Sequence, residues 1–208
     1  MKKVLLIVAA LLVGFTANAQ LTADGGYFHA FEKSSTAAGY SSPGQDGLFL
    51  GARYTLDLED LMEGLFFSPG LNFSALKGKV LLADVILPNT TTRELAINMP
   101  LSLVFKYNFM SDFAVYGLFG PTLQLGLLNN IVAKNDNATY RYDMYKSNNL
   151  VDAARKPFNV YLGLGAGVEV ADRIQVNVGF DFGLLNLATG KNDKITRNVL
   201  KIGVGYIF

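Results

Sequence analysis

The sequence predicts an all-β protein: an eight-stranded antiparallel up-and-down transmembrane β-barrel. Two observations carry this prediction. Apolar residues alternate with small or polar residues over long stretches, and the connections between these stretches are alternately short and long. Half of the residues are hydrophobic, yet no apolar run beyond Phe15 approaches the ~20 residues of a membrane-spanning helix. A membrane barrel explains this combination, because only every second residue of a strand has to face lipid.

Residues 1–19 are typical of a secretory signal peptide. Lys2 and Lys3 supply a positive start, Val4–Phe15 forms an apolar run, and Ala17-Asn18-Ala19 is a small-x-small cleavage site. The alternative is an uncleaved anchor, which the shortness of the apolar run disfavours. The sequence contains no cysteine, which excludes a lipid-modified cysteine, disulfides and thiolate metal sites. We therefore expect one barrel domain over residues 20–208.

The clearest strand covers Arg173–Leu184, where strict alternation places six apolar residues on one face and polar residues or glycines on the other. The preceding strand, Phe158–Val170, repeats this pattern, and only Ala171-Asp172 separates the two, which predicts a tight hairpin. The last strand is expected over Val199–Phe208. The remaining strands are expected at Tyr27–Phe31 (part of the first strand, its register open), Leu48–Asp57, Leu65–Ala75, Glu94–Tyr107 and Phe113–Leu127.

The connections after the second, fourth and sixth strands are short, and the others are long and polar. Outer-membrane barrels have short periplasmic turns and long extracellular loops, so this asymmetry favours that class. An even number of strands also places both ends of the barrel at one rim. The short connections are 58–64, 108–112 and 171–172, and the long ones are 32–46, 77–91, 128–157 and 186–194.

A soluble barrel with its apolar face turned inward is the rival interpretation. Its outer surface would then consist of the second face of each strand, where the many glycines could not form a hydrated surface. The apolar faces also end in aromatic residues, which suits a girdle at a membrane interface. The last residue of the sequence is a phenylalanine, and it falls on the alternating positions that are expected to face lipid. The expected girdle residues are Tyr107, Phe113, Tyr206 and Phe208.

The inward faces carry charges of both signs. Eight strands leave room for side chains but not for an aqueous pore. Because an unpaired charge in such a lumen would be costly, we expect a network of paired charges that fills the interior. The predicted members of this lumen charge network are Arg53, Lys106, Glu169, Asp181 and Lys201, with Asp57 and Arg173 also directed inward.

No pattern in the sequence indicates catalysis, a cofactor or a metal. The glycines of residues 163–167 superficially resemble a phosphate-binding loop, but they lie two apart in an alternating strand with no helix after them. His29, the only histidine, could serve a lipid hydrolase only with a serine such as Ser68 or Ser74 and a carboxylate beside it. Removal of Lys2 and Lys3 with the signal changes the formal charge from +1 to −1, and there is no basic stripe, so a nucleic-acid partner is not expected.

The leading functional prediction is a monomeric structural or interaction scaffold of the bacterial outer membrane, not an enzyme. It contacts outer-membrane lipid and presents surface loops to a protein partner, chiefly residues 128–157, which contain three tyrosines among mixed charges. The alternative is transport of small solutes through a narrow pore or a lateral passage. It rests on Pro69, Pro100 and Pro121, which lie within strands and lack an amide donor.

Several motifs resemble the outer-membrane β-barrel domain family that is common in Bacteroidetes and includes PorT-like proteins. Leu95–Leu101 with the following Val104–Tyr107 is similar to a recurring strand of that family, Phe113–Pro121 resembles its aromatic Gly-Pro strand, and Leu162–Glu169 its Gly-x-Gly-x-Gly strand. The aromatic terminus Tyr206-Ile207-Phe208 completes the resemblance. The resemblance implies an eight-stranded outer-membrane barrel without agreed catalytic residues, with a part in protein secretion for some members. The first strand departs from the expected glycine-rich opening, with only Gly25-Gly26 present.

Overall fold

The computed structural model describes residues 19–35, 40–41, 44–58, 60–82, 85–135, 138–146 and 154–208. The predicted signal peptide, residues 1–19, lies outside these residues except for Ala19, where the first strand begins. The strands are β1 (Ala19–Ser35), β2 (Tyr40–Ser41), β3 (Gly44–Asp57), β4 (Leu65–Leu82), β5 (Val85–Met110), β6 (Phe113–Asn135), β7 (Ala138–Asp143), β8 (Phe158–Val170), β9 (Ile174–Gly183) and β10 (Lys194–Ile207).

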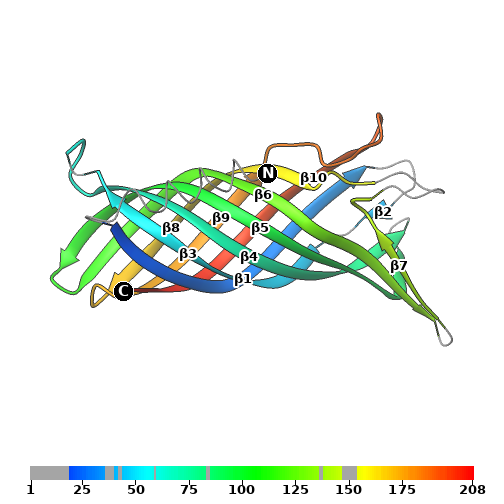
Figure 1. Ribbon diagram of the computed structural model, residues 1–208, viewed down its shortest axis with the longest axis horizontal. Helices are drawn as coiled ribbons and strands as arrows, with labels where there is room; N and C mark the ends of the chain where they lie inside the picture. Colours follow the sequence, from blue (N-terminus) through cyan, green and yellow to red (C-terminus); the bar gives the residue numbers. More distant parts are fainter. Residues whose placement is uncertain are drawn as a thin grey trace, which may run out of the picture.

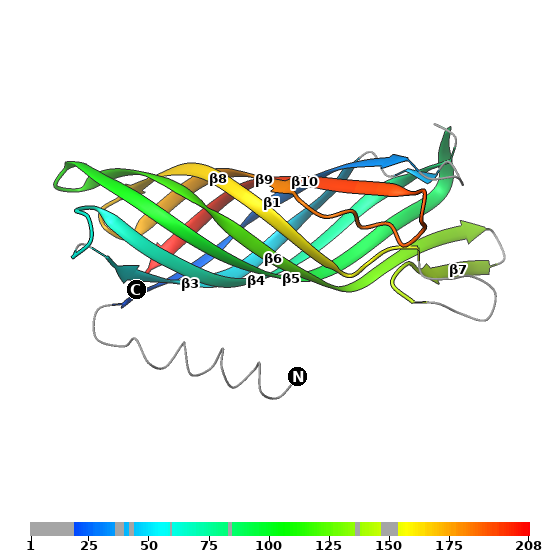
Figure 2. The ribbon, with the colours of Figure 1, turned by 90° about the horizontal axis from the view of Figure 1, so that it is seen from above.

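Eight of these strands form a closed antiparallel ring, in the order β1-β3-β4-β5-β6-β8-β9-β10, and β10 pairs with β1 to close it. Figures 1 and 2 show the strands winding around the long axis of a barrel. The short strands β2 and β7 lie outside the ring and extend the ladders of β4 and β6 at one end. The predicted eight-stranded antiparallel barrel is confirmed. The first strand, whose register the sequence left open, pairs Tyr27 with Ile202 on one side and with Leu48 on the other.

The two ends of the barrel differ in their connections. The short turns that contain 60–64, 111–112 and 171–173 lie at one end, together with the C-terminus, and we call this the turn end (Figure 1). Ala171 and Asp172 both have left-handed φ angles, 53° and 54°, as the two central residues of a type I′ turn require, and Arg173 N donates to Val170 O across this turn. Three residues therefore connect β8 and β9, one more than predicted. The opposite end, here called the loop end, carries the longer connections and β7.

Several segments predicted as loops are strands. β4 and β5 continue to within two residues of each other, β6 runs to Asn135 and turns back as β7, and β10 begins at Lys194. In these extensions both faces of the strands are polar or mixed, so the alternation that revealed the membrane-spanning part is missing. Threonines and cross-strand pairs such as Lys79 with Thr91 hold the extensions together in water instead. The predicted loops 77–91 and 128–157 are therefore largely hairpins.

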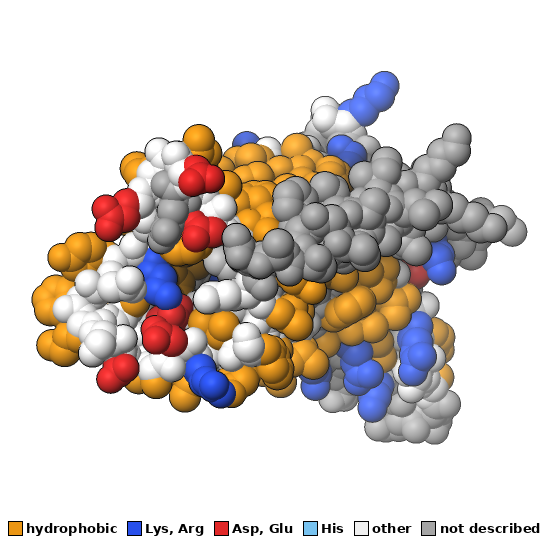
Figure 3. Space-filling view, turned by 60° about the vertical axis from the view of Figure 1, so that its left-hand side comes forward, with side chains coloured by type: hydrophobic (Ala, Val, Ile, Leu, Met, Phe, Trp, Pro, Cys, Tyr) orange, Lys and Arg blue, Asp and Glu red, His pale blue; other side chains and the backbone are white. Residues whose placement is uncertain are grey.

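The apolar faces point outward. On β10 the exposed fractions of Ile202, Val204 and Tyr206 are 48%, 55% and 41%, while the alternating residues Gly203 and Gly205 face inward and are buried. On β5 the outward apolar face runs from Leu95 to Tyr107, which is ~40 Å of strand at ~3.3 Å per residue, or ~30 Å across a bilayer at a tilt of roughly 40°. Figure 3 shows the hydrophobic surface between charged side chains at both ends. This band matches the thickness of a bilayer's hydrocarbon core.

Candidate functional site

The lumen is the candidate functional site, and at its turn end five polar side chains form one continuous chain of contacts. Arg53 forms an ion pair with Asp24, with 2.9 Å between Nε and Oδ2. Arg53 Nη2 also donates to Gln175 Oε1 at 2.8 Å, and Gln175 Nε2 donates to Glu169 Oε2 at 2.9 Å. The ammonium of Lys106 pairs with the same Glu169. Side chains from β1, β3, β9, β8 and β5 thus meet, with each charge next to one of opposite sign.

A third ion pair joins β9 and β10, with 2.7 Å between Lys201 Nζ and Asp181 Oδ2. The glycines of β8 make room for such inward side chains. A Cβ at Gly163 would lie 2.4 Å from Asp181 Oδ1, and a Cβ at Gly167 would lie 2.4 Å from the ring of Tyr116. The glycine-rich stretch is therefore a strand that lets lumen side chains approach the wall, and no phosphate-binding loop is formed there.

Uncharged groups occupy the next level of the lumen. The amide of Asn98 donates to Asn72 Oδ1 and to Ser74 Oγ, both at 2.9 Å. Gln124 Nε2 donates to Asn98 Oδ1, and the Tyr161 hydroxyl donates to Gln124 Oε1, again at 2.9 Å each. All five side chains are buried, so this network satisfies polar groups that water does not reach. The adjoining apolar cluster consists of Phe28, Ala30, Phe49, Leu76, Tyr161 and Val199.

Nearer the loop end, a fully buried ion pair spans the barrel. Arg197 Nη1 on β10 lies 2.6 Å from Glu94 Oε1 on β5, and the side chains are 1% and 0% exposed. β10 and β5 stand opposite each other in the ring, with three strands between them on either side. Arg197 also donates to Gln45 Oε1 at 2.8 Å, and Asn129 donates to Glu94 Oε2 at 3.0 Å. Because groups from opposite walls meet at the axis, the lumen is occupied at this level.

The mouth at the loop end is covered by connecting segments. Arg155, in the segment before β8, places Nη1 2.6 Å from Glu32 Oε2 on β1, and both side chains are almost completely buried. The backbone of Arg155 bridges to Ala188, and Lys156 N donates to Leu187 O at 2.8 Å. The segments before β8 and before β10 therefore lie together, anchored by a buried ion pair.

Tyr145 also turns into the mouth. Its hydroxyl would lie 2.2 Å from a Cβ built on Gly126, so its ring occupies space that only a glycine leaves free. Burial raises the pKa of the Tyr145 hydroxyl, and the nearby Glu94 carboxylate raises it further. Tyr145 is therefore a neutral hydroxyl group beside Glu94 and Asn129.

All five residues predicted for the lumen charge network lie inside, and the structure brings them together in three ion pairs. Arg53 pairs with Asp24, Lys106 with Glu169, and Lys201 with Asp181. Asp57 lies on the inward side of β3, opposite the lumen-lining Phe66, and is exposed at the turn end, where the lumen opens to solvent. The inward prediction for Arg173 was wrong, because this residue lies in the turn before β9 with its side chain exposed. Arg173 donates to the outward Tyr206 hydroxyl at 3.1 Å.

The sequence prediction missed the charges nearer the loop end. Glu94 lies on the inward parity of its strand and could have been selected on that ground. Glu32 and Arg155 fall in segments predicted as loops. Arg197 lies between the predicted loop 186–194 and the predicted last strand. The alternation of apolar and polar residues therefore gave no signal for these three residues. Asp24 precedes the only part of the first strand that the pattern revealed.

The aromatic residues predicted for a girdle lie at the turn end. Tyr107, Tyr206 and Phe208 are 59%, 41% and 76% exposed, and Phe113 is half-buried. The rings of Tyr206 and Phe208 meet edge to face with 5.2 Å between centroids. This is the position of an aromatic belt at a membrane interface.

The hydrolase constellation is not assembled. His29 points outward, where its Nδ1 lies 2.6 Å from Asp46 Oδ1 and the Tyr27 hydroxyl bonds the same carboxylate. Ser68 and Ser74 are buried on the lumen side of the sheet, 1% and 3% exposed. The described part of the chain contains no cluster of three or more metal-ligating side chains. In that same part no helix has the length and apolarity needed to cross a membrane.

Together the closed ring, the outward apolar band and the filled interior define a small transmembrane β-barrel. The profile of the outer membrane protein beta-barrel domain family matches residues 6–208, and the chain belongs to that family. The protein is located in the bacterial outer membrane, where it contacts lipid.

Comparison with solved structures gives similar folds at low sequence identity. OprG from Pseudomonas aeruginosa has a TM-score of 0.50 and 13% identity, with 91% of this chain and 96% of that chain covered. Neisserial surface protein A has a TM-score of 0.47 and 15% identity, with 92% and 99% covered. Ail, the attachment invasion locus protein of Yersinia pestis, has 0.45 and 14%, with the same coverage. Comparison with curated proteins gives no match.

Proposed function

We propose that the protein is a closed scaffold barrel of the outer membrane, without enzymatic activity, that presents rigid extracellular hairpins to a protein partner. The observation that carries the proposal is the ion pair between Arg197 and Glu94, which occupies the lumen between opposite walls. Because the lumen is closed in this way, the protein acts through its outer surface. The β4–β5 and β6–β7 hairpins extend beyond the apolar band at the loop end, and their paired backbones hold a defined surface.

Three further features belong to this proposal. The chain acts as a monomer, because the ring closes on itself through β1 and β10 and the eight strands of the ring are paired on both sides. Residues 1–19 form a cleaved signal peptide, on the grounds of their charge, apolar run and cleavage motif. The motifs in Leu95–Leu101 and Phe113–Pro121 support a place in the PorT-like branch common in Bacteroidetes.

Site-specific photo-cross-linking tests the scaffold function. A photoreactive residue in place of Tyr140 on β7, which is 66% exposed, is expected to give one defined protein adduct in intact outer membranes. Met110, equally exposed at 67% but at the turn end, is the matched control. The same adducts from both positions, or none from Tyr140, would contradict presentation by the hairpins. Mass spectrometry of the adduct identifies the partner.

A lateral passage for small apolar solutes is the second candidate, and a specific observation favours it. Three successive ladders each skip two residue pairs next to a proline: β3–β4 at Pro69, β4–β5 at Pro100 and β5–β6 at Pro121. Pairs that lack a backbone donor are easier to open than a continuous ladder. The weakened positions lie side by side within the apolar band, so an opening there would face lipid.

Replacing Pro121 with Val restores a backbone donor at this place. If solutes pass there, flux of a small apolar dye into proteoliposomes is expected to fall severalfold, because the closed ladder is stabilised. The matched control is Pro88→Val, since Pro88 is exposed on β5 beyond the apolar band. Flux that Pro121→Val leaves unchanged would count against lateral passage. Planar-bilayer recordings of the wild type and of the Pro121→Val variant are expected to show no stable conductance, because the lumen is occupied.

A further inference from the structure

The outward face of the barrel changes from apolar to polar at one level near the loop end. The pairing register joins a single row of residues across β1, β3, β4, β5 and β6: His29, Asp46, Lys77, Arg93 and Asn130. The next outward row toward the turn end is Tyr27, Leu48, Ala75, Leu95 and Leu128. This step marks the boundary between the hydrocarbon core and the headgroup layer of the outer leaflet.

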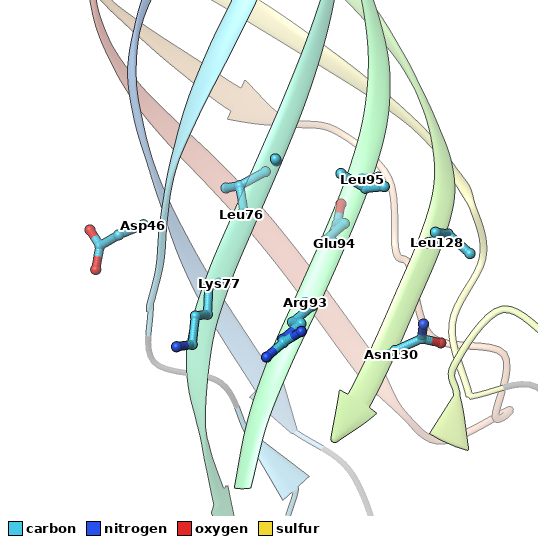
Figure 4. Close-up of a pocket in the computed structure, with 9 residues that line it drawn as sticks. Asp46, Leu76, Lys77, Arg93, Glu94, Leu95, Leu128 and Asn130 are labelled. Atoms are coloured by element: carbon cyan, nitrogen blue, oxygen red, sulfur yellow. The ribbon is translucent and has the colours of Figure 1, made fainter. Parts of the chain in front are cut away.

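Lys77 and Arg93 form an uncompensated pair of positive charges in the polar row. They are direct cross-strand partners, and like charges in that arrangement destabilise a sheet. Both are exposed, and neither forms an ion pair within the described ranges of the chain. Asp46, the cross-strand neighbour of Lys77 on β3, accepts from Tyr27 and contacts His29. Figure 4 shows its oxygens directed away from Lys77.

A groove of about 350 Å³ lies across this boundary and combines the two rows. Its apolar side is lined by Ala75, Leu76, Leu95 and Leu128, and its polar side by Lys77, Arg93, Asn130, Asp46 and Glu94. The Glu94 carboxylate is paired with Arg197 in the lumen, and Leu95 and Leu128 can be followed in Figure 4. Leu95 and Leu128 are 43% and 39% exposed, so they offer contact area to a further apolar group. The apolar side of the groove therefore lies level with the hydrocarbon core of the leaflet, and its polar side lies level with the headgroups.

We propose that this groove binds one phosphorylated glycolipid of the outer leaflet. Its phosphate would lie between the Lys77 ammonium and the Arg93 guanidinium, which can hold two phosphate oxygens at once. Asn130 would offer an amide donor to the sugar. One acyl chain would follow Ala75, Leu95 and Leu128 toward the turn end. A bound phosphate would also relieve the repulsion between the two cations.

Lipid binding to the purified, folded full-length barrel tests this proposal by native mass spectrometry. The probes are lipid A and the same lipid A after enzymatic removal of its phosphates. The wild type is expected to retain the phosphorylated lipid about tenfold better or more, since charge-assisted hydrogen bonds of this kind contribute at least roughly that factor. The variant Lys77→Gln with Arg93→Gln is expected to lose this preference.

The matched control removes the same two residue types elsewhere on the loop end. Lys134→Gln with Arg141→Gln changes an exposed lysine and an exposed arginine on β6 and β7 and should keep the preference. Circular dichroism and the heat-dependent shift in gel mobility verify that each variant is folded. Equal retention of both lipids by the wild type, or unchanged retention in the Lys77/Arg93 variant, would overturn the proposal. So would complete displacement of the lipid by millimolar inorganic phosphate, because the site would then be one for a soluble anion.

Discussion

Replacing Arg197 with Met is expected to lower the free energy of unfolding by roughly 3–5 kcal/mol, the cost of leaving the buried partner charge unpaired. Glu94 is completely buried, and without Arg197 its carboxylate loses its direct ion-pair partner and keeps only the hydrogen bonds from Asn129 and Tyr145 and the more distant charge of Arg155. Methionine keeps much of the volume of the arginine, so the effect reports the charge rather than a cavity. The measurement is urea unfolding from lipid vesicles, followed by circular dichroism because the chain has no tryptophan.

The double variant Glu94→Met with Arg197→Met should recover most of this loss, because it removes both charges at once. Arg141→Met is the matched control. Arg141 is exposed on β7, where an isolated surface charge contributes roughly 0–1 kcal/mol. An Arg197→Met protein that unfolds at the urea concentration of the wild type would show that the ion pair does not hold the two walls together.

Val178→Arg is expected to destabilise the folded protein by roughly 2–4 kcal/mol, the cost of an arginine on the lipid face near the bilayer midplane. Val178 lies in the middle of β9, points outward and is 49% exposed. In a soluble barrel such a substitution at an exposed position would be nearly neutral, so the result separates lipid from water as the outer solvent. Urea unfolding from vesicles again provides the free energy.

The control is the same type of substitution at a different depth in the membrane. Phe109→Arg places the same charge on an exposed position at the turn end, beside Tyr107, where the expected cost is only about 0–1 kcal/mol. Equal effects at Val178 and Phe109 would mean that the surface between the two ends does not face hydrocarbon.

The membrane-spanning part of the fold could be predicted from the sequence because one face of every strand there is apolar. For β8 and β9 the alternation predicted the strand limits to within one residue and the facing of the side chains inside the strands. The same argument failed for β4 to β7 at the loop end, because strands with water on both faces carry no hydrophobic period. The predicted loop 77–91 therefore included Lys77, and Arg93 was assigned to neither a loop nor a strand, although the two residues lie on paired strands.

The alternation of inward and outward residues along each strand identified the inward charges near the turn end, but it could not identify their partners. Arg53 reaches Gln175, and Arg197 reaches Glu94, across strands that are far apart in the chain. Such contacts depend on the order and stagger of the closed ring, which no local pattern encodes. Arg155 is the extreme case, since a residue of a connecting segment is buried only because the segment folds over the mouth.

The seam between β1 and β10 has a consequence for biogenesis. Strands β1 and β10 form the closing ladder, from Thr22 with Ile207 to Ser35 with Lys194. A sheet that lacks β10 has two edges with unpaired backbone amides, which hydrocarbon does not tolerate. Stable insertion therefore requires β10, and a variant without residues 194–207 is expected to stay outside the membrane.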